Sequence, residues 1–534
     1  MQPVLNVEDV RRVEQALKRE GVSLMELMRR AGTAAANEVL ALGGVKSVLV
    51  LAGFGNNGGD GWVAAEELLR AGIKVCVVTP MAPGDLKGDL APVVARSAVE
   101  AGVPVVVGPP RQDLERLVMT ADCVLDAMLG TGFHGQPTAP FDIWIDVVNE
   151  CGARVVAVDV PSGLSAQTGM APGACVVAEV TCTMIALKPG LLADMGRDMC
   201  GTIVVAPLAE QTERLVNEAD PVAWRVDAED YVEVIQPPTC AQDKFTRGSV
   251  LVVAGSARFP GAAIMCARAA ARAGAGYVTL AVPATIAPAV QAHLIEIPVV
   301  PLPAAADGTF DAEAAPIAAK LAERADAVVV GPGIRVNAGT VTVVSKLLES
   351  ECPLVMDADA LNCLARVSSN RLDSFPELVR RNAPLILTPH RGELGRLMGL
   401  PDTPPDSLTA ALEASRRIVW ANGGSEFCLV AKGNATACVG VEVALLPKPG
   451  PASLATAGSG DALAGILAAL LARDPHCPNL PLLCALGCEV HGFAGSIAAQ
   501  RYGSNGAMAM DIIEAIGLAS DAVEDRAAFP DDVQ

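Results

Sequence analysis

Short, continuously apolar segments recur along this chain, each followed by glycine and then by a helical pattern. Strands that are apolar throughout are buried on both faces, and their alternation with helices is typical of parallel sheets covered by helices. We therefore predict an α/β fold with two domains, each a mostly parallel sheet covered by helices. The predicted strand segments are residues 48–53, 75–79, 123–128, 155–160, 250–255, 278–282, 327–331, 354–357 and 385–388.

The length of 534 residues favours more than one core. Hydrophobic residues make up 51% of the chain and charged residues 19%, so ample apolar surface can be buried. Residues 207–238 are more polar, carry several acids and end in Pro237-Pro238, after which the strand–glycine–helix pattern restarts. We place the boundary within residues 219–228. The predicted domains are residues 1–222 and 223–534.

The charge and the cysteines restrict the partners and the compartment. A net charge of -20 argues against nucleic acid and anionic membranes, which both need a basic face. The fifteen cysteines form no Cys-x-x-Cys pair, and several lie in apolar segments, which favours buried free thiols in a reducing compartment. The N-terminal residues have no apolar signal-peptide core, and no uninterrupted apolar run reaches membrane-spanning length. We expect a cytoplasmic protein.

The strongest motif of the first half is Gly-Phe-Gly-Asn-Asn-Gly-Gly-Asp-Gly, which follows a strand and opens a helix. Glycines let a backbone approach a phosphate closely, and a helix N-terminus offers free N–H donors. An ordinary tight turn would need the glycines alone, whereas this turn also holds two asparagines and an aspartate. The pattern is not Gly-x-Gly-x-x-Gly, so it does not indicate a standard dinucleotide fold. The candidate ligand contacts are Asn56, Asn57, Gly58, Gly59 and Asp60.

Two further strand ends carry an acid and glycines. Asp126 is followed by Gly130-Thr131-Gly132, and Asp159 is followed by a Pro-Ser-Gly turn. An acid in this position is commonly a helix cap. Because the carboxyl ends of parallel strands meet at one edge of a sheet, three such ends predict a shared pocket there.

These segments, with Lys188-Pro189-Gly190, resemble the NAD(P)H-hydrate epimerase family, which implies a Rossmann-like front domain. The resemblance implies that the Asn-Asn-Gly-Gly-Asp turn contacts a hydrated cofactor. It implies a potassium ion bound by Asn57, Asp126 and Ser162, whose oxygen donors suit an alkali cation. It also implies substrate contacts from Asp159, Gly130, Thr131, Gly132 and Gln136.

The family reaction inverts the hydroxyl-bearing C6 of a hydrated dihydronicotinamide. Proton transfers at that carbon suit a carboxylate or an amine in a closed pocket. Asp159 and Lys188 are the catalytic candidates, and the sequence leaves open which is acid and which is base. A solvated lysine before a Pro-Gly turn is the competing interpretation of Lys188.

The strongest motif of the second half is Gly458-Ser459-Gly460-Asp461, followed by an Ala/Leu-rich helix. The glycine turn can wrap an anion with backbone N–H groups, and the helix dipole favours an ionised Asp461. A carboxylate beside a phosphate cradle is what deprotonation of a hydroxyl for attack on phosphorus requires. The alternative is an aspartate that only caps the helix.

This motif resembles the ribokinase-like superfamily, and other segments narrow the resemblance to NAD(P)H-hydrate dehydratase. They are residues 255–263, 331–333, 356–362, 388–393 and 432–436. The resemblance implies substrate contacts from Ala263, Gly333, His390 and Asp461, and adenine-nucleotide contacts from Lys432, Gly433, Asn434, Ala435, Thr436 and Gly460. Asp461 would activate the C6 hydroxyl for transfer of a phosphoryl group from ADP or ATP, and phosphate would then leave. The sequence does not distinguish the two donors.

Several residues of the second half have two interpretations. His390 is either a substrate contact or a residue that satisfies backbone groups, and His491 fits packed structure better. Asp357 and Asn362 are candidates for binding magnesium or positioning phosphates, and Asp359 fits a turn. The family commonly has His-Lys-Gly where this chain has Asp243-Lys244-Phe245. A glycine usually follows the Gly-Pro-Gly turn, whereas this chain has Ile334-Arg335 there. Both cations are candidates for substrate phosphates.

Two other functions compete with cofactor repair. The second half could be a ribokinase-like kinase of a vitamin precursor fused to a regulatory, non-catalytic nucleotide-binding module, because the same cradle would serve both reactions. The first half could be a binding module, although its intact acids argue against loss of catalysis. We expect the hydrated cofactors NADHX and NADPHX as substrates, no nucleic-acid or membrane partner, and a homo-oligomer.

Overall fold

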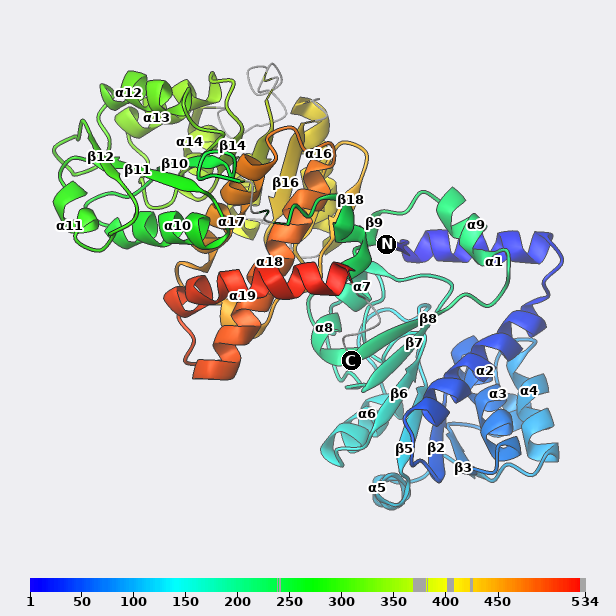
Figure 1. The fold of residues 1–534 in the computed structure, drawn as a ribbon. Coiled ribbons are helices and arrows are strands. Elements are labelled where there is room, and N and C mark those ends of the chain that lie inside the picture. The colour runs from blue at the N-terminus through cyan, green and yellow to red at the C-terminus, as the bar shows by residue number, and fades with distance from the viewer. Residues whose placement is uncertain are drawn as a thin grey trace. The chain divides into compact units, whose positions relative to one another are not determined.

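The computed structural model describes residues 1–237, 239, 242–367, 381, 383–400, 408–422 and 426–528 (Figure 1). Pro238 and Cys240 lie outside the described residues. The chain divides into a front unit, Gln2–Val222, and a back unit that contains nearly all of the remainder from Ala223. Each unit is built around its own sheet, which confirms the predicted α/β fold class.

The front unit contains a parallel sheet in the order β4-β3-β2-β5-β6-β7-β8. The chain builds outward from β2 to β4, then returns to the other side of β2 and continues to β8. The order therefore reverses between β2 and β5, which is where open α/β sheets bind ligands. Its strands are β2 (Ser47–Ala52), β3 (Lys74–Thr79), β4 (Val105–Val107), β5 (Cys123–Ala127), β6 (Val155–Val158), β7 (Val180–Met184) and β8 (Thr202–Ala206), and the short strand β1 (Gln2–Val4) is not part of this sheet.

Helices cover both faces of this sheet because its strands are apolar on both sides. Val48 and Val50 pack into one core with Trp62 of α3, whereas Leu49 and Leu51 pack into another with α6. The helices are α1 (Val7–Arg19), α2 (Leu24–Ala41), α3 (Asn56–Arg70), α4 (Ala91–Glu100), α5 (Arg111–Thr120), α6 (Phe141–Glu150), α7 (Pro189–Leu192), α8 (Gly196–Met199), α9 (Thr212–Glu218) and the 3₁₀ turn η1 (Pro83–Asp85).

The back unit repeats this principle with a larger sheet. Its strands are β9 (Ala223–Arg225), β10 (Ser249–Val253), β11 (Tyr277–Pro283), β12 (Val299–Leu302), β13 (Ala327–Val330), β14 (Leu354–Met356), β15 (Leu385–Leu387), β16 (Phe427–Ala431), β17 (Ala437–Val439) and β18 (Ala444–Leu446). They run in the order β9-β18-β17-β16-β15-β14-β13-β10-β11-β12. Strands β10 to β16 pair in parallel, and the β16–β17–β18 meander is antiparallel. The order reverses between β10 and β13.

Helices also cover the back sheet, with α10 and α17 packed against β10 (Figure 1). The helices are α10 (Pro260–Arg272), α11 (Ala287–Gln291), α12 (Ala314–Ala322), α13 (Ala338–Leu348), α14 (Asp359–Val367), α15 (Arg391–Leu397), α16 (Leu408–Asn422), α17 (Ser459–Arg473), α18 (Leu480–Tyr502), α19 (Ala509–Ala528) and the 3₁₀ turns η2 (Ala228–Glu233) and η5 (Ala452–Leu454).

Within the described residues, α18 is the one helix whose length and hydropathy would suffice to cross a membrane. Its apolar window is 72% buried, so it is a core helix of the back unit. The fourteen cysteines in the described part of the chain are free thiols, most of them buried.

Candidate functional site

The front site is a cavity of about 540 Å³ at the carboxyl ends of the central strands. The turn after β2 contributes Asn56, Asn57 and Asp60, and the turn after β6 contributes Asp159. The turn after β5 contributes Gly130, Thr131 and Gly132, and Lys188 lines the same cavity. The three predicted strand ends therefore converge on one pocket.

The two glycines of the Asn-Asn-Gly-Gly-Asp turn allow close packing and do not line the cavity. A Cβ on Gly58 would lie 2.1 Å from the carbonyl oxygen of Gly53, and one on Gly59 would lie 2.7 Å from the Met28 sulfur. The backbone contact at Gly58 is impossible, so that position needs glycine for the helix to start against the strand, whereas a side chain at position 59 would require the end of the Met28 side chain to move. The polar side chains of the turn are thereby held at the cavity wall.

Lys188 and Asp159 form a buried ion pair. The Lys188 side chain has no exposed surface, and its Nζ lies 2.5 Å from Asp159 Oδ1 and 2.7 Å from Thr183 Oγ1. Burial alone would raise the pKa of Asp159, but the Lys188 charge and hydrogen bonds from neighbouring groups hold that pKa below its ordinary value. The solvated-lysine interpretation is therefore wrong, and Asp159 is an ionised carboxylate paired with the Lys188 ammonium.

Asp126 and Ser162 form a second buried polar group in the front unit. The Ser162 backbone N–H donates to Asp126 Oδ2 at 2.7 Å, and the Ser162 hydroxyl donates to Oδ1 at 2.6 Å. The Leu129 N–H donates to the Ser162 hydroxyl at 2.9 Å. Burial raises the pKa of Asp126 to about 6 despite these hydrogen bonds. Neither side chain lines the cavity itself, and Leu129 joins them to it.

Asn57 and Gln136, two further predicted contacts, have different surroundings. Asn57 lines the cavity beside Gly130, and its buried Nδ2 has no hydrogen-bond partner among the described residues. Gln136 lies outside the cavity lining, and its amide donates to the carbonyl oxygen of Pro172 at 2.7 Å.

Helix α1 brings two cavity residues that sequence reasoning missed. Arg11 and Glu14 both line the pocket. Burial raises the pKa of Glu14, and the charge of Asp159 raises it further. The pKa of Asp60 is raised well above its ordinary value by burial and by the charges of Asp159 and Glu14. The only sequence signal for Glu14 was its place on the apolar face of an amphipathic helix.

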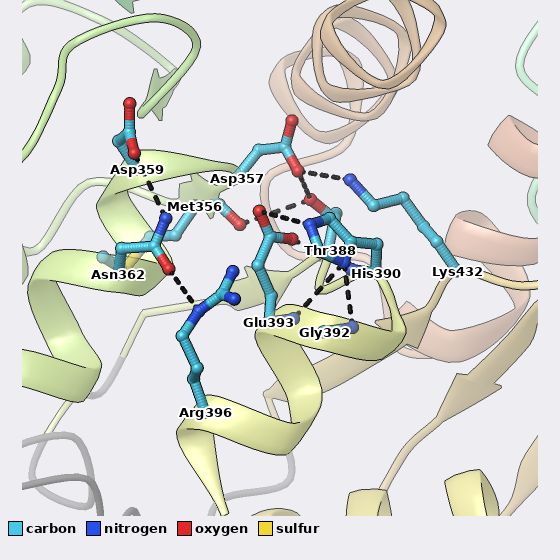
Figure 2. Close-up of polar contacts among 10 residues, drawn as sticks. All are labelled: Met356, Asp357, Asp359, Asn362, Thr388, His390, Gly392, Glu393, Arg396 and Lys432. Atoms are coloured by element: carbon cyan, nitrogen blue, oxygen red, sulfur yellow. Dashed lines mark hydrogen bonds and ion pairs between the residues drawn. The ribbon is translucent and has the colours of Figure 1, made fainter. Parts of the chain in front are cut away.

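The back site forms around Asp357, immediately after β14 (Figure 2). The buried Asp357 carboxylate accepts hydrogen bonds at Oδ1 from Lys432 Nζ and from the Thr388 hydroxyl, both at 2.6 Å. Lys432 directly follows β16, and Thr388 directly follows β15. Three adjacent parallel strands thus deliver an acid, a hydroxyl and a cation to one point. Thr388 and the Lys432–Asp357 pair were not predicted as contacts.

His390 begins helix α15 as its N-cap (Figure 2). Its Nδ1 accepts from the Gly392 N–H at 3.0 Å, while Glu393 Oε2 accepts from the His390 N–H at 2.9 Å. Burial lowers the pKa of His390, with a further contribution from the charge of Lys432. Burial raises the pKa of Glu393 to about 7. His390 therefore satisfies backbone groups, while its side chain remains 55% exposed at this edge of the sheet.

Asp461 is the third residue of α17, whose N-cap is Gly458 in a left-handed conformation with φ of 95°. A Cβ on Gly460 would lie 3.4 Å from Lys432 Nζ, so the glycine turn adjoins the Asp357–Lys432 pair. Asp461 makes no hydrogen bond or ion pair within the described part of the chain. Burial raises its pKa to about 7, and the charge of Asp357 adds to this effect. Asp461 is thus an unpaired carboxyl beside a cation and a glycine turn.

Other predicted residues of the back half fall into three settings. Gly333, at φ of 67°, lies at the site edge after β13, where the Ser256 hydroxyl donates to its carbonyl oxygen at 2.6 Å. Ala263 is fully buried in the core. Gly433 to Thr436 form the turn between β16 and β17, directly after Lys432.

The network around Asp359 is structural (Figure 2). Asn362 Nδ2 donates to Asp359 Oδ1 at 3.1 Å, and Arg396 Nε donates to Asn362 Oδ1 at 2.9 Å. The Arg335 N–H donates to Asp359 Oδ2 at 3.0 Å. Asn362 is committed to this network, and Asp359 is the first residue of helix α14 rather than part of a turn.

Lys244 and His491 are two further residues for which the sequence predicted a role or a location. Lys244 precedes β10 and lies at the amino edge of the sheet, opposite the site, so its predicted role with substrate phosphates is wrong. His491 is buried as expected, and its Nε2 lies 3.1 Å from the Ser459 hydroxyl.

Comparisons with known proteins match both halves. The model of the NAD(P)H-hydrate dehydratase family matches residues 250–517, and that of the YjeF-related protein N-terminus matches residues 24–190. A bifunctional NAD(P)H-hydrate repair enzyme of Salinibacter ruber is 35% identical, covering 94% of this chain and 92% of the relative. One of Escherichia coli is 34% identical, covering 95% and 92%. The solved ADP/ATP-dependent NAD(P)H-hydrate dehydratase from Bacillus subtilis, co-crystallised with ATP/Mg²⁺, is 24% identical, covering 56% of this chain and 97% of that one, with a TM-score of 0.46.

Proposed function

Because this chain belongs to the family of bifunctional NAD(P)H-hydrate repair enzymes, we propose that its front cavity is the epimerisation site and its Asp461 centre the dehydration site. The chain is a bifunctional NAD(P)H-hydrate epimerase and dehydratase. The observation that carries the front assignment is the buried Lys188–Asp159 pair in a cavity. The back assignment depends on the unpaired Asp461 beside Lys432.

In the front site, Asp159 acts as the base toward the C6 hydroxyl of the substrate. Its lowered pKa keeps it ionised, and Lys188 stabilises that charge without access to solvent. We therefore propose Asp159 as the base and Lys188 as the residue that holds it in place, the two roles that the sequence left open. The N-terminus of α3, with Asn56 and Asn57, faces the same cavity and suits the polar end of the substrate.

A potassium ion fits the oxygen donors of Asn57, Asp126 and Ser162. The Asp126–Ser162 group is buried, and Asn57 lines the neighbouring cavity wall. Oxygen ligands of this kind suit a hard cation. When bound, the ion would supply positive charge at the wall of the cavity and fix the turns after β2 and β5.

In the back site, Asp461 removes the proton of the C6 hydroxyl as that oxygen attacks the terminal phosphorus of ADP or ATP. The attack forms a C6–O–P linkage, and the donor nucleotide departs with one phosphate fewer. The linkage then breaks between C6 and oxygen as the ring nitrogen donates its electron pair, and loss of a C5 proton restores the C5=C6 bond. Phosphate leaves C6 of this ester far more readily than hydroxide would leave the unmodified substrate.

The nucleotide is proposed to lie along the turn of Lys432, Gly433, Asn434, Ala435 and Thr436, with its phosphates at Gly460. Lys432 and the N-terminus of α17 are the positive groups there. Magnesium fits Asp357, because the ion needs only one or two carboxylates when phosphates and water complete its shell. It would neutralise phosphate charge at that point.

Separate assays of the two reactions test these assignments. Wild-type protein supplied with the S-epimer of NADHX and a nucleotide should regain the absorbance of NADH. The kinase alternative would require phosphorylation of a vitamin precursor without that recovery. We further propose that NADPHX is also a substrate and that the protein is cytoplasmic. We also propose that the chain forms a homo-oligomer, and light scattering after size-exclusion chromatography tests this oligomeric state.

A further inference from the structure

One face of helix α1 lines the front cavity. Val7, Val10, Arg11 and Glu14 all contribute to its wall. Their spacing of three, four and seven residues places them on one side of the helix. Val13 and Leu17, both buried, anchor α1 in the core of the front unit. The Glu14 side chain is therefore held at the cavity by a packed helix.

Glu14 has no structural partner in the described part of the protein, unlike its neighbours on α1. Glu8 and Asp9 are both paired with Arg12, at 2.7 and 2.8 Å. Glu14 is half-buried and makes no hydrogen bond or ion pair there. An unpaired carboxyl at a cavity wall costs stability, so it points to a role in the chemistry of the site.

The surroundings of Glu14 and Asp159 shift the pKa values of these two carboxyl groups in opposite directions. Burial and the charge of Asp159 raise the pKa of Glu14, and the charge of Arg11 only partly offsets them. Asp159, by contrast, is kept ionised by Lys188. Asp60 is also driven toward its neutral form by burial and by both of these acids. Two carboxyl groups whose environments shift their pKa values in opposite directions are typical of an acid–base pair.

We propose that Glu14 is a second catalytic residue of epimerisation, which gives a proton to the ring nitrogen N1 of the substrate while Asp159 takes one from the C6 hydroxyl. This inference rests on the proposed location of the epimerisation site. Glu14 lies one helical turn from the exposed Arg11 and is therefore close to solvent, whereas Asp60 lies on α3. Glu14 can therefore exchange its proton with water between turnovers.

The reaction balances without an oxidant or a leaving group. C6 carries a hydroxyl and is bonded to N1, so loss of the hydroxyl proton to Asp159 forms a C6=O bond as the C6–N1 bond breaks. The electron pair passes to N1, which receives the Glu14 proton. Rotation about the C5–C6 bond turns the other face of the aldehyde to N1. N1 then re-forms its bond to C6 and returns its proton to Glu14, while Asp159 returns a proton to oxygen.

The test compares Glu14→Gln with Glu8→Gln in the full-length chain. Glu8 lies on the same helix outside the cavity lining, so the same change there should leave epimerisation unchanged. The assay supplies pure R-epimer with a nucleotide and follows NADH absorbance, with the S-epimer assayed separately to confirm that dehydration is intact. Loss of a general acid typically costs about a hundredfold to ten-thousandfold, so Glu14→Gln should lower kcat at least a hundredfold. An unchanged kcat, or a change in KM alone, would overturn the proposal.

A second variant covers the case in which Glu14→Gln does not fold. Glu14→Asp retains the carboxyl group, and it should keep part of the activity with a shifted alkaline limb in the pH profile of kcat. An unchanged profile would overturn the role of Glu14. Asp159→Asn tests the site itself: if this variant still epimerises at the wild-type rate, the proposed site is wrong. If Asp159→Asn is inactive while Glu14→Gln is fully active, only the inference about Glu14 is refuted.

Discussion

Replacement of Asp159 by asparagine should leave the Lys188 ammonium buried without its counter-charge. Lys188 has no exposed surface, and its remaining acceptors would be neutral: Thr183 Oγ1 and the Met184 carbonyl oxygen, at 2.7 and 2.9 Å, and the asparagine amide oxygen. Asparagine tolerates the left-handed backbone at this position, where φ is 66°, so the change is confined to the charge. Breaking a buried pair by removing one partner costs about 3–5 kcal/mol. At about 2–4 °C per kcal/mol for a unit of this size, the front unit should melt about 6–20 °C lower.

Replacing both partners distinguishes a buried charge from a general packing defect. Asp159→Asn combined with Lys188→Met removes both charges, and removal of a whole buried pair is often nearly neutral. The double variant should therefore regain most of the lost stability. Asp113→Asn is the matched control, because its exposed pair with Arg116 at 3.1 Å should contribute under about 1 kcal/mol.

Differential scanning calorimetry measures these shifts. The pKa of Asp159 is lowered in the folded protein, so its stabilisation is present above the ordinary pKa of an aspartate, about 4, and is lost as the pH falls below that. The difference between wild type and Asp159→Asn should shrink accordingly. A loss below about 1 kcal/mol at neutral pH, or one that does not change with pH, would refute the reasoning.

Further predictions concern both sites. Asp461→Asn should lower dehydration about a hundredfold to ten-thousandfold, measured with the S-epimer, and leave epimerisation unchanged; equal loss of both reactions would contradict separate sites. Because Asp461 must be ionised and its pKa is about 7, dehydration should rise as the pH increases through 7 in a stopped-flow series, and a flat profile would exclude it as the base. Replacing potassium by tetramethylammonium should lower the melting temperature of the front unit in the wild type but not in Asp126→Asn. Gly58→Ala should abolish epimerisation, because its Cβ would meet the Gly53 carbonyl oxygen at 2.1 Å; a fully active variant would show that the turn can shift.

The sheets could be predicted because parallel strands buried on both faces must be apolar throughout. The segments at 48–53 and 123–128, for example, became β2 and β5. The residues at their carboxyl ends could be predicted for the same reason, since strand direction alone brings Asp126 and Asp159 to one edge. The same principle places Lys244 at the opposite edge of the sheet, because this residue precedes β10 instead of following it.

Contacts between distant segments could not be predicted from the local pattern. Glu14 occupies a helix whose other acids, Glu8 and Asp9, pair with Arg12, and only the packing of α1 against the sheet brings Glu14 to the cavity. Lys188 precedes a Pro-Gly turn that is usually exposed, yet its ammonium is buried because Asp159 lies 2.5 Å away. Nothing in the local sequence marks Thr388, which follows β15, as a site residue, and its contact with Asp357 depends on the pairing of β15 with β14.

The assignment of one reaction to each unit is tested most directly by the products formed from pure R-epimer of NADHX in the presence of a nucleotide. The wild-type chain should form NADH faster than spontaneous epimerisation allows. Asp461→Asn should accumulate the S-epimer without forming NADH, and Asp159→Asn should form NADH only at the spontaneous rate. Formation of NADH by Asp159→Asn at the wild-type rate, or failure of Asp461→Asn to produce the S-epimer, would contradict this division of the chemistry.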